Sequence, residues 1–346
     1  MRRLAAVLVI LLAWAAFGFG VNRFLDSRKS RLAARHVAVS PTHEKPRFSL
    51  PGVIYVSQAG RLYRLQGGTF EVLPLPAADG AWMQPAAAGP GRLLLVARAE
   101  EYSDVYLVDA ASGQVVRRLT NNVTPHPSHV ELNAWSFWPH LATDGATVVS
   151  AYDGPKTGTT YEVHFAVWSG ALAGNVERTQ WTAPTLYTGG DVSPVPTPSG
   201  GVVYTSYALD ARSQIVSRIA FVSRPGATPV YLTAQADDCG QPALSADGTH
   251  LAVICTADRQ TDHLEVIPLT ATGPAPPVVV VASCLCASPA WSPDGSSLLY
   301  LAPRDATGHF QLWWVDRAAT PAPAPPRAIT QDLDLDATSA PAWAAA

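Results

Sequence analysis

The segment Pro289-Ala-Trp-Ser-Pro-Asp-Gly-Ser-Ser-Leu-Leu-Tyr300 has the pattern of a β-hairpin, with two apolar runs on either side of Asp294-Gly295. An Asp-Gly pair favours a tight turn, because Gly adopts positive φ without steric penalty. Two more β-forming runs follow, Leu312-Trp-Trp-Val315 and Ala328-Ile-Thr330. The unit therefore predicts four β-strands joined by short connections.

This hairpin pattern recurs along the chain. A Pro is followed six residues later by a Gly in five places, and an aliphatic residue comes three residues after each Gly. The five pairs are Pro85 and Gly91, Pro139 and Gly145, Pro194 and Gly200, Pro242 and Gly248, and Pro289 and Gly295. Successive Pro residues of the pattern are 47 to 55 residues apart, close to the period of a propeller blade. Four strands at this period predict one blade of a β-propeller.

The two ends of the chain supply complementary parts of one further blade. Pro341-Ala-Trp343 repeats the start of a blade without its turn Gly, whereas Gly52 and Tyr55 repeat a turn without its first strand. We therefore expect the C-terminal strand to pair with the segment near Val53, which closes the ring and covers two sheet edges. The predicted fold is an all-β, six-bladed β-propeller of four-stranded blades over residues 50–346.

The segment Pro289–Tyr300, with Leu312-Trp-Trp-Val-Asp316, resembles the TolB-type propeller repeat, and the resemblance covers residues 50–346. It implies the propeller fold but no single activity, because this repeat occurs in TolB, in the propellers of prolyl oligopeptidase-like hydrolases and in oligogalacturonate lyases. TolB has a mixed α/β domain before its propeller, and here an apolar segment and a polar stalk occupy that place. The resemblance therefore does not imply TolB's role with peptidoglycan-associated lipoprotein.

The N-terminal segment predicts a hydrophobic helix that enters a membrane. Residues 4–20 carry no charge and follow Arg2 and Arg3. As a helix they would span about 25 Å, near the lower limit for crossing a bilayer. We expect residues 1–22 to be a signal anchor or transmembrane helix. Ala13-Trp-Ala15 also permits signal cleavage and a secreted protein.

Residues 23–49 predict a flexible polar stalk, because they are rich in Arg, Ser, His and Pro and lack apolar periodicity. The positive charges after the apolar segment outnumber those before it, so the positive-inside rule favours a cytoplasmic propeller. The signal-like N-terminus and the TolB resemblance favour the opposite orientation. We expect a single-pass protein of the cytoplasmic membrane with its propeller outside the cytoplasm, in the periplasm or the extracellular space.

The composition and the absence of certain motifs exclude several functions. A net charge of −3 from 24 basic and 27 acidic residues leaves no broad basic surface for nucleic acid. The sequence contains no Gly-x-Ser-x-Gly, Gly-x-x-x-x-Gly-Lys or His-Glu-x-x-His motif, which are the signals of serine hydrolases, P-loop NTPases and zincin proteases. We predict no catalytic residue and no cofactor, apart from one candidate divalent-metal site.

The candidate metal site consists of His126, His129, Glu131 and His140, around an aromatic run that leads into an inner strand. Imidazole and carboxylate groups can bind a divalent ion. Since the run is predicted to start at one mouth of the propeller channel, these residues would form a site there, as in a lyase-like enzyme. The competing interpretation is a polar loop with incidental His residues.

Acidic residues recur just before the predicted inner strands, in loops that surround one mouth of the channel. They include Asp79, Asp191, Asp238, Asp334 and Asp336. Pooled negative charge on such a rim would attract a cation or a basic peptide. The competing interpretation is that these Asp residues cap turns in solvated loops.

The four cysteines permit three pairings. Cys239 and Cys255 lie at equal distances in sequence from Asp247, so they face each other across a predicted hairpin and are the candidate disulfide. Cys284 and Cys286 are left to pair with each other, to bind a ligand or to stay reduced.

Together these features favour a membrane-tethered, extracytoplasmic propeller that serves as a non-catalytic scaffold for a protein or a glycan. The second hypothesis is a metal-dependent, lyase-like enzyme with its site at the channel mouth. A stoichiometric metal in the purified protein would distinguish the enzyme from the scaffold.

Overall fold

The computed structural model describes residues 50–78, 80–126, 128–156, 163–256, 261–305 and 308–345. The predicted helix of residues 1–22, the stalk of residues 23–49 and Asp79 lie outside the described residues. No helix in the described part of the chain is long and apolar enough to cross a membrane.

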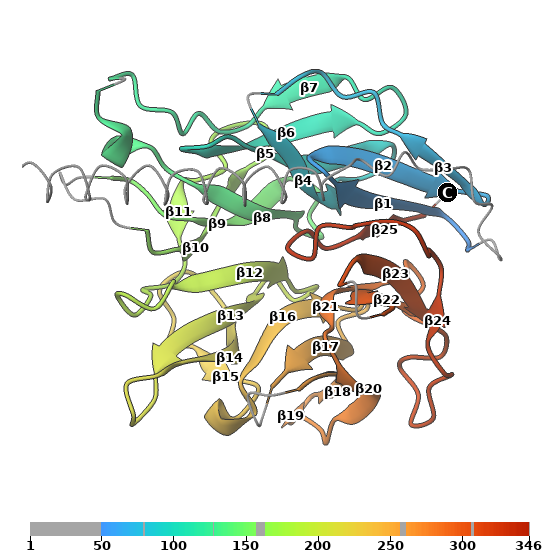
Figure 1. Cartoon of the computed structure of the whole chain (residues 1–346). Helices are drawn as coiled ribbons and strands as arrows, with labels where there is room; N and C mark the ends of the chain where they lie inside the picture. Colours follow the sequence, from blue (N-terminus) through green and yellow to red (C-terminus); the bar gives the residue numbers. More distant parts are fainter. Residues whose placement is uncertain are drawn as a thin grey trace, which may run out of the picture. The chain divides into compact units, whose positions relative to one another are not determined.

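The strands form six antiparallel sheets, which are the blades of a propeller (Figure 1). Blade 1 contains β25 (Ala342–Ala344), β1 (Val53–Gln58), β2 (Arg61–Gln66) and β3 (Thr69–Val72). Blade 2 contains β4 (Ala81–Ala87), β5 (Arg92–Arg98), β6 (Ser103–Asp109) and β7 (Val115–Arg118). Blade 3 contains β8 (Ser136–Leu141), β9 (Thr147–Tyr152), β10 (Ala166–Ala171) and β11 (Thr179–Gln180).

The second half of the ring repeats this arrangement. Blade 4 contains β12 (Asp191–Pro196), β13 (Val202–Leu209), β14 (Ile215–Val222) and β15 (Val230–Tyr231). Blade 5 contains β16 (Cys239–Leu244), β17 (His250–Cys255) and β18 (Asp262–Thr270), with the short β19 (Gly273–Pro274) and β20 (Val278–Cys284) both paired to β18. Blade 6 contains β21 (Ala287–Trp291), β22 (Leu298–Pro303), β23 (Phe310–Val315) and β24 (Arg327–Ala328). The 3-10 helices η1 (Val130–Leu132) and η2 (Gln235–Asp237) precede blades 3 and 5.

The Asp-Gly turns form as the sequence pattern predicts. In the β16–β17 turn, the Asp247 carboxylate accepts hydrogen bonds from Ser245 Oγ at 2.6 Å and from Thr249 N at 3.0 Å. These bonds lower the pKa of Asp247 to about 2, and Gly248 takes a φ of +73°. The Asp of the motif therefore stabilises the turn, and the Gly supplies the backbone conformation that the turn requires.

The first strand of blades 2 to 6 carries a β-bulge that the sequence pattern did not predict. In each, the residue before the repeat Pro has a positive φ of 50° to 55°, and the strand register shifts there. These residues are Gln84, Trp138, Ser193, Gln241 and Ser288. At a bulge, the side chain and the backbone N–H of the extra residue point away from the regular hydrogen-bond pattern of the sheet.

Several bulges form hydrogen bonds between neighbouring blades. Gln84 Oε1 accepts from Trp138 N at 2.7 Å, and Gln241 Oε1 accepts from Ser288 N at 2.6 Å. Gln84 N donates to Ser339 Oγ at 2.7 Å. The residue before the repeat Pro thus joins blades together, in addition to shaping its own strand.

The core consists of apolar clusters between adjacent blades. Leu94 and Val105 of blade 2 pack in one cluster with Val148 of blade 3, and all three are fully buried. Side chains alternate between the two faces of a strand. Each blade therefore buries the side chains of one face against the preceding blade and those of the other face against the following blade. This arrangement explains the near-continuous apolar runs of the second and third strands.

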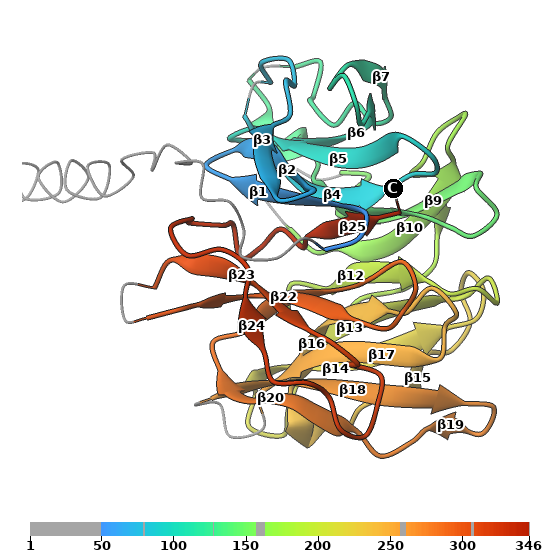
Figure 2. The same ribbon diagram turned by 90° about the vertical axis from the view of Figure 1, so that its right-hand side faces the viewer.

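The C-terminal strand pairs with the first strand of the described chain. In the antiparallel register of β25 and β1, Ala344 lies opposite Val53 and Trp343 opposite Ile54. Trp343 Nε1 also donates to Pro51 O at 2.7 Å. In Figures 1 and 2, β25 (red) lies beside β1 (blue), and β25 also contacts β4 of the next blade.

Candidate functional site

One face of the propeller collects the loops that lead from blade to blade, together with the hairpin loops between the second and third strands of each blade. These loops share a face because successive strands run in opposite directions. We call it the loop face. The described residues of the predicted acidic rim lie in or next to loops on this face. The loop that precedes β8, the strand of His140, lies there too.

The predicted acidic rim is wrong for Asp191, which is only 3% exposed. Burial raises the pKa of Asp191, and hydrogen bonds from the side chains of Thr182 and Ser206 oppose this rise. Asp191 is the first residue of β12, so the start of the strand takes it into the protein instead of leaving it on the rim. Its carboxyl group is not available to a partner in solution.

The other described rim residues have polar partners, and only the partner of Asp336 is local in sequence. Asp238 Oδ1 accepts from Ser217 N at 2.7 Å, and Asp336 Oδ1 accepts from Thr338 N at 2.9 Å. Asp334 Oδ2 lies 3.2 Å from His309 Nδ1. The Asp336 contact matches the turn-capping interpretation, whereas Asp238 and Asp334 contact residues that are distant in sequence. A binding role for Asp238, Asp334 and Asp336 stays a prediction.

The residues of the predicted metal site do not come together in the described part of the chain. His129 Nδ1 lies 2.7 Å from Glu131 Oε1, on the exposed loop that also carries His126. His140 lies on β8, where burial lowers the pKa of its imidazole. Within the described residues, only Cys239, Cys255 and Glu265 bring three metal-binding atoms within 4.8 Å of one another. His140 lies on β8 and the other three residues lie on the loop before it, so the four do not form a close group within the described residues, and a metal-binding role for them stays a prediction.

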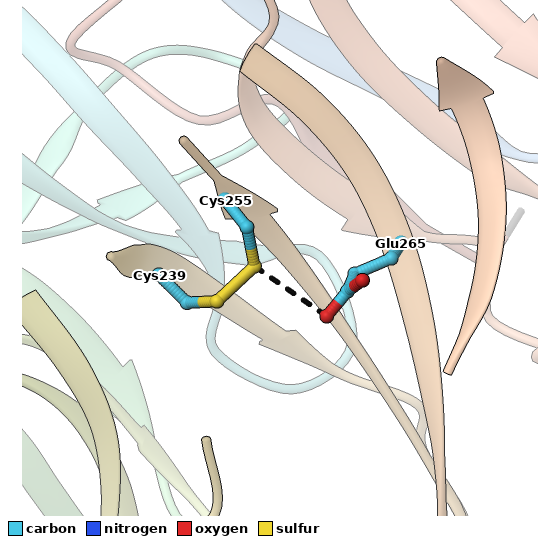
Figure 3. Close-up of side chains that lie close together, drawn as sticks. All are labelled: Cys239, Cys255 and Glu265. Atoms are coloured by element: carbon cyan, nitrogen blue, oxygen red, sulfur yellow. Dashed lines mark hydrogen bonds between the residues drawn. A yellow bond between two sulfur atoms is a disulfide. The ribbon is translucent and has the colours of Figure 1, made fainter. Parts of the chain in front are cut away.

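The group formed by Cys239, Cys255 and Glu265 is centred on a disulfide (Figure 3). Cys239 and Cys255 are directly opposite in the β16–β17 register, their Cα atoms are 4.0 Å apart and their sulfur atoms are bonded. The pairing is the one that the sequence favours. Glu265 Oε1 lies 3.4 Å from Cys255 Sγ. Since a metal is bound by thiolates, a pair of disulfide sulfurs is not a suitable ligand set.

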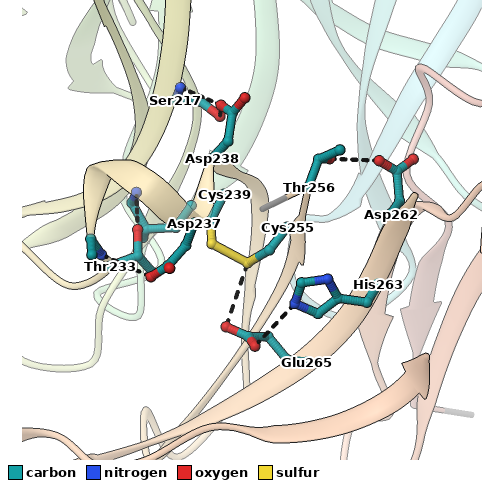
Figure 4. Close-up of a disulfide and its surroundings, with 12 residues drawn as sticks. Ser217, Thr233, Asp237, Asp238, Cys239, Cys255, Thr256, Asp262, His263 and Glu265 are labelled. Carbon is teal, nitrogen blue, oxygen red and sulfur yellow. Dashed lines mark hydrogen bonds and ion pairs between the residues drawn. A yellow bond between two sulfur atoms is a disulfide. The ribbon is translucent and has the colours of Figure 1, made fainter. Parts of the chain in front are cut away.

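The surroundings of this disulfide tie three strands of blade 5 together (Figure 4). His263 Nε2 lies 3.4 Å from Glu265 Oε2, and Thr256 Oγ1 donates to Asp262 Oδ1 at 2.5 Å. Burial raises the pKa of Glu265, and the adjacent His263 opposes this rise. Cys284 and Cys286, whose state the sequence left open, are bonded to each other. The Cys239–Cys255 disulfide and the Thr256–Asp262 hydrogen bond thus link β16, the end of β17 and β18.

Large apolar side chains are exposed on the loop face, in or next to the connections of blades 3 and 4. We call them the apolar patch; they are Val163, Leu186, Tyr187, Leu209 and Ile215. Their loops are adjacent, because Thr188 Oγ1 donates to Tyr207 O at 3.1 Å and Asp191 N donates to Phe165 O at 2.8 Å. Leu209 and Ile215 are opposite each other in the β13–β14 register. The repeat pattern does not predict this patch; its signal in the sequence is the apolar pair Leu186-Tyr187 within a loop rich in Thr and Gly.

Tyr187 is the most exposed of these side chains. It is 78% exposed and has a φ of +62°. A bulky residue in the left-handed region is uncommon, and such conformations often occur at functional sites. The loop thus presents an aromatic ring to solvent that the described part of the propeller does not cover.

No protein-family model matches the chain, and no curated protein sequence matches it. Among solved structures, TolB from Acinetobacter baumannii is similar, with a TM-score of 0.62 and 16% identity over 85% of this chain and 67% of that one. A structure described as TolB from Agrobacterium tumefaciens has a TM-score of 0.59 and 12% identity over 84% of this chain and 93% of that one.

A third similar structure is the hydrazine synthase of Kuenenia stuttgartiensis, with a TM-score of 0.58 and 12% identity over 87% of this chain and 48% of that one. At these identities the likeness shows the fold alone. The chain has the six-bladed propeller fold of the TolB structures.

Proposed function

We propose that this propeller is a non-catalytic scaffold that binds a protein partner through the apolar patch. The observation that carries the proposal is the exposure of five large apolar side chains in adjacent loops of one face. Contiguous exposed apolar surface on a soluble domain usually marks an interaction site. Tyr is also enriched among the residues that contribute most to protein interfaces.

The TolB-type fold supports a scaffold, because a propeller presents the loops of several blades on one rigid face. Rigid presentation lowers the entropy lost on binding. The metal-dependent, lyase-like alternative has less support, because His126, His129, Glu131 and His140 do not form a close group within the described residues. The scaffold is therefore the function that the geometry supports best.

The proposal also places the propeller outside the cytoplasm, tethered to the membrane by residues 1–22. Two disulfides support this location, because disulfides persist in oxidising compartments and are rare in the cytosol. The uncharged residues 4–20 supply the proposed anchor. The positive charges that follow this segment are the observation against it.

The experiment is capture by chemical cross-linking of the full chain in its native membrane. The patch variant carries Leu186→Ser and Tyr187→Ser, and the matched control carries Val115→Ser and Val116→Ser on β7, where both side chains are also exposed. We expect one protein to be cross-linked to the wild type and to the control but lost from the patch variant. Equal capture by all three proteins would refute the proposed surface.

A further inference from the structure

A cleft of about 520 Å³ lies at the interface between blades 2 and 3, and none of its lining residues belongs to the apolar patch. We call it the seam cleft. Blade 2 contributes Arg117 and Arg118, and the loop after β7 contributes Asn122. Blade 3 contributes Tyr152, at the end of β9, and Glu177, just before β11. The volume falls within the range of small-molecule sites, about 300 to 1,000 Å³.

The connection between β10 and β11 brings Glu177 into the seam cleft. Val176, beside it, is fully buried in the cluster that joins blades 2 and 3. A Cβ at Gly170 would clash with the backbone oxygen of Asn175, so Gly allows the connection to fold back over β10. Arg117 Nη2 donates to Gly174 O at 2.6 Å. The connection is thus held between the blades by apolar packing and by a hydrogen bond from blade 2.

The Glu177 side chain is only partly exposed, and its carboxyl group accepts from neutral donors. Ser136 Oγ donates to Glu177 Oε1, and Asn122 Nδ2 lies 3.5 Å from the same oxygen. Arg118 instead forms its ion pair with Asp104, at 2.5 Å. Within the described residues, Glu177 forms no ion pair. Burial raises the pKa of Glu177 to about 7, and the negative charges of Asp104 and Asp153 add to this rise.

Other polar groups on this side of blade 3 have unused hydrogen-bonding capacity. Within the described residues, no hydrogen bond involves the Tyr152 hydroxyl or Glu177 Oε2. Ser150 Oγ and Trp168 Nε1 are buried without a partner, and the two residues are opposite each other in the β9–β10 register. They share a strand face with Tyr152, because Ser150 and Tyr152 are two residues apart on β9. Ser150 and Trp168 do not line the seam cleft, so the groups open to a polar ligand there are the Tyr152 hydroxyl and Glu177 Oε2.

The charges of the seam cleft indicate the class of ligand. Arg118 is paired with Asp104, which lies behind the lining, and Arg117 and Glu177 are the other charged groups of the cleft. With Glu177 ionised, the site is therefore close to neutral and does not select a strongly anionic or cationic molecule. Its guanidinium, amide, phenol and carboxyl groups include both donors and acceptors. A sugar hydroxyl both donates and accepts, and so it can use all of them.

We propose that the seam cleft binds a neutral saccharide of one or two units. In its ionised form, Glu177 accepts from the sugar hydroxyls through Oε2, and the Tyr152 hydroxyl and the Arg117 guanidinium donate to them. This site would be separate from the surface proposed for the protein partner. A variant that loses sugar binding should still bind the protein partner, and a variant that loses the protein partner should still bind the sugar.

The test uses the detergent-solubilised full chain and six probes, observed by saturation-transfer NMR and isothermal titration calorimetry. Glucose, N-acetylglucosamine, cellobiose and chitobiose are the neutral probes; galacturonate and glucosamine are the charged ones. We expect at least one neutral probe to bind at millimolar concentration. At pH 8, Glu177→Gln should weaken this binding about tenfold, because Ser136 and Asn122 hold the amide oxygen at the Oε1 position and an amide NH2, which cannot accept, replaces Oε2. Tyr152→Phe should weaken it about threefold, because it removes a hydroxyl group.

The matched controls are Glu131→Gln on the exposed loop and Tyr187→Phe in the apolar patch, and both should bind the sugar as the wild type does. Tyr152→Phe removes a hydroxyl without a hydrogen-bond partner in the described residues, so a folding defect cannot explain its effect. Three results would each overturn the proposal: no neutral probe bound at about 20 mM, tighter binding of a charged probe, or wild-type affinity in both cleft variants.

Discussion

Replacing Glu177 with Gln removes the buried carboxyl group whose pKa is raised from 4.5 to about 7. Between these two pH values, the folded wild type keeps a proton that the unfolded chain releases. The stability contributed by protonated Glu177 is therefore fully present below pH 4.5 and is lost as the pH rises through 7. Gln does not titrate, so the variant does not lose this stability.

The size of the effect follows from the change in proton affinity. The difference between 4.5 and about 7 corresponds to about 3 kcal/mol, because each tenfold change in affinity is worth about 1.4 kcal/mol. Partial exposure of the Glu177 side chain reduces this value to about 2 to 3 kcal/mol. Relative to the wild type, Glu177→Gln should gain this free energy of unfolding between pH 4.5 and pH 8. In a propeller of about 300 residues, the gain raises Tm by about 3 to 5 °C.

The assay is thermal and urea unfolding of the wild type and the variant at several values between pH 4.5 and 8.5. Both proteins keep the neighbouring charged groups, which are Asp104 and the ion pair of Asp153 with Lys156. Their titration therefore largely cancels in the difference in unfolding free energy between the two proteins. The control is Glu131→Gln, since the pKa of the Glu131 carboxyl is lowered by a hydrogen bond from His129 and this change should give no gain at high pH. A stability difference for Glu177→Gln that stays constant with pH, or grows as the pH falls, would refute the reasoning.

Three further predictions concern ring closure, location and the disulfide. Deleting residues 338–346 removes β25 and leaves an edge of β1 unpaired, so we expect aggregation in analytical ultracentrifugation; a monomer with an unchanged Tm would contradict this. A reporter enzyme that needs an oxidising compartment should be active when fused after Ala346, whereas activity only from a cytoplasmic reporter would show that the positive-inside count is correct. Cys239→Ser with Cys255→Ser opens a cross-link between residues 16 apart and should lower the free energy of unfolding by about 3 kcal/mol in urea titrations. An unchanged midpoint would show that this cross-link does not stabilise the propeller.

Local and repeated features could be read from the sequence. The spacing of Pro and Gly predicted five hairpins and the blade period, because each turn depends only on a few neighbouring residues. Cys239 and Cys255 could be paired because hairpin register is a matter of counting from the turn. Pro341-Ala-Trp343 revealed a strand that needed a partner at the other end of the chain, and β25 lies beside β1.

The tertiary structure decided which side chains meet. His126 and His140 are close in sequence, yet His126 lies on a loop and the half-buried His140 lies on β8, and within the described residues they do not join a close group of metal-binding atoms. Asp191 resembles the other acidic loop residues in the sequence, but it starts a strand and is buried. Side-chain direction changes at a strand boundary or a bulge, and such local changes do not alter the repeat pattern.

The seam cleft shows the same limit most clearly. Glu177 lies more than fifty residues from Arg117 and Arg118, and neither position belongs to the repeat motif. They meet because the β10–β11 connection folds back and buries Val176 between two blades. The repeated local pattern thus determined the blades and their number. Convergence of residues from different blades depended on how adjacent sheets pack, and this packing sets which polar groups are desolvated together.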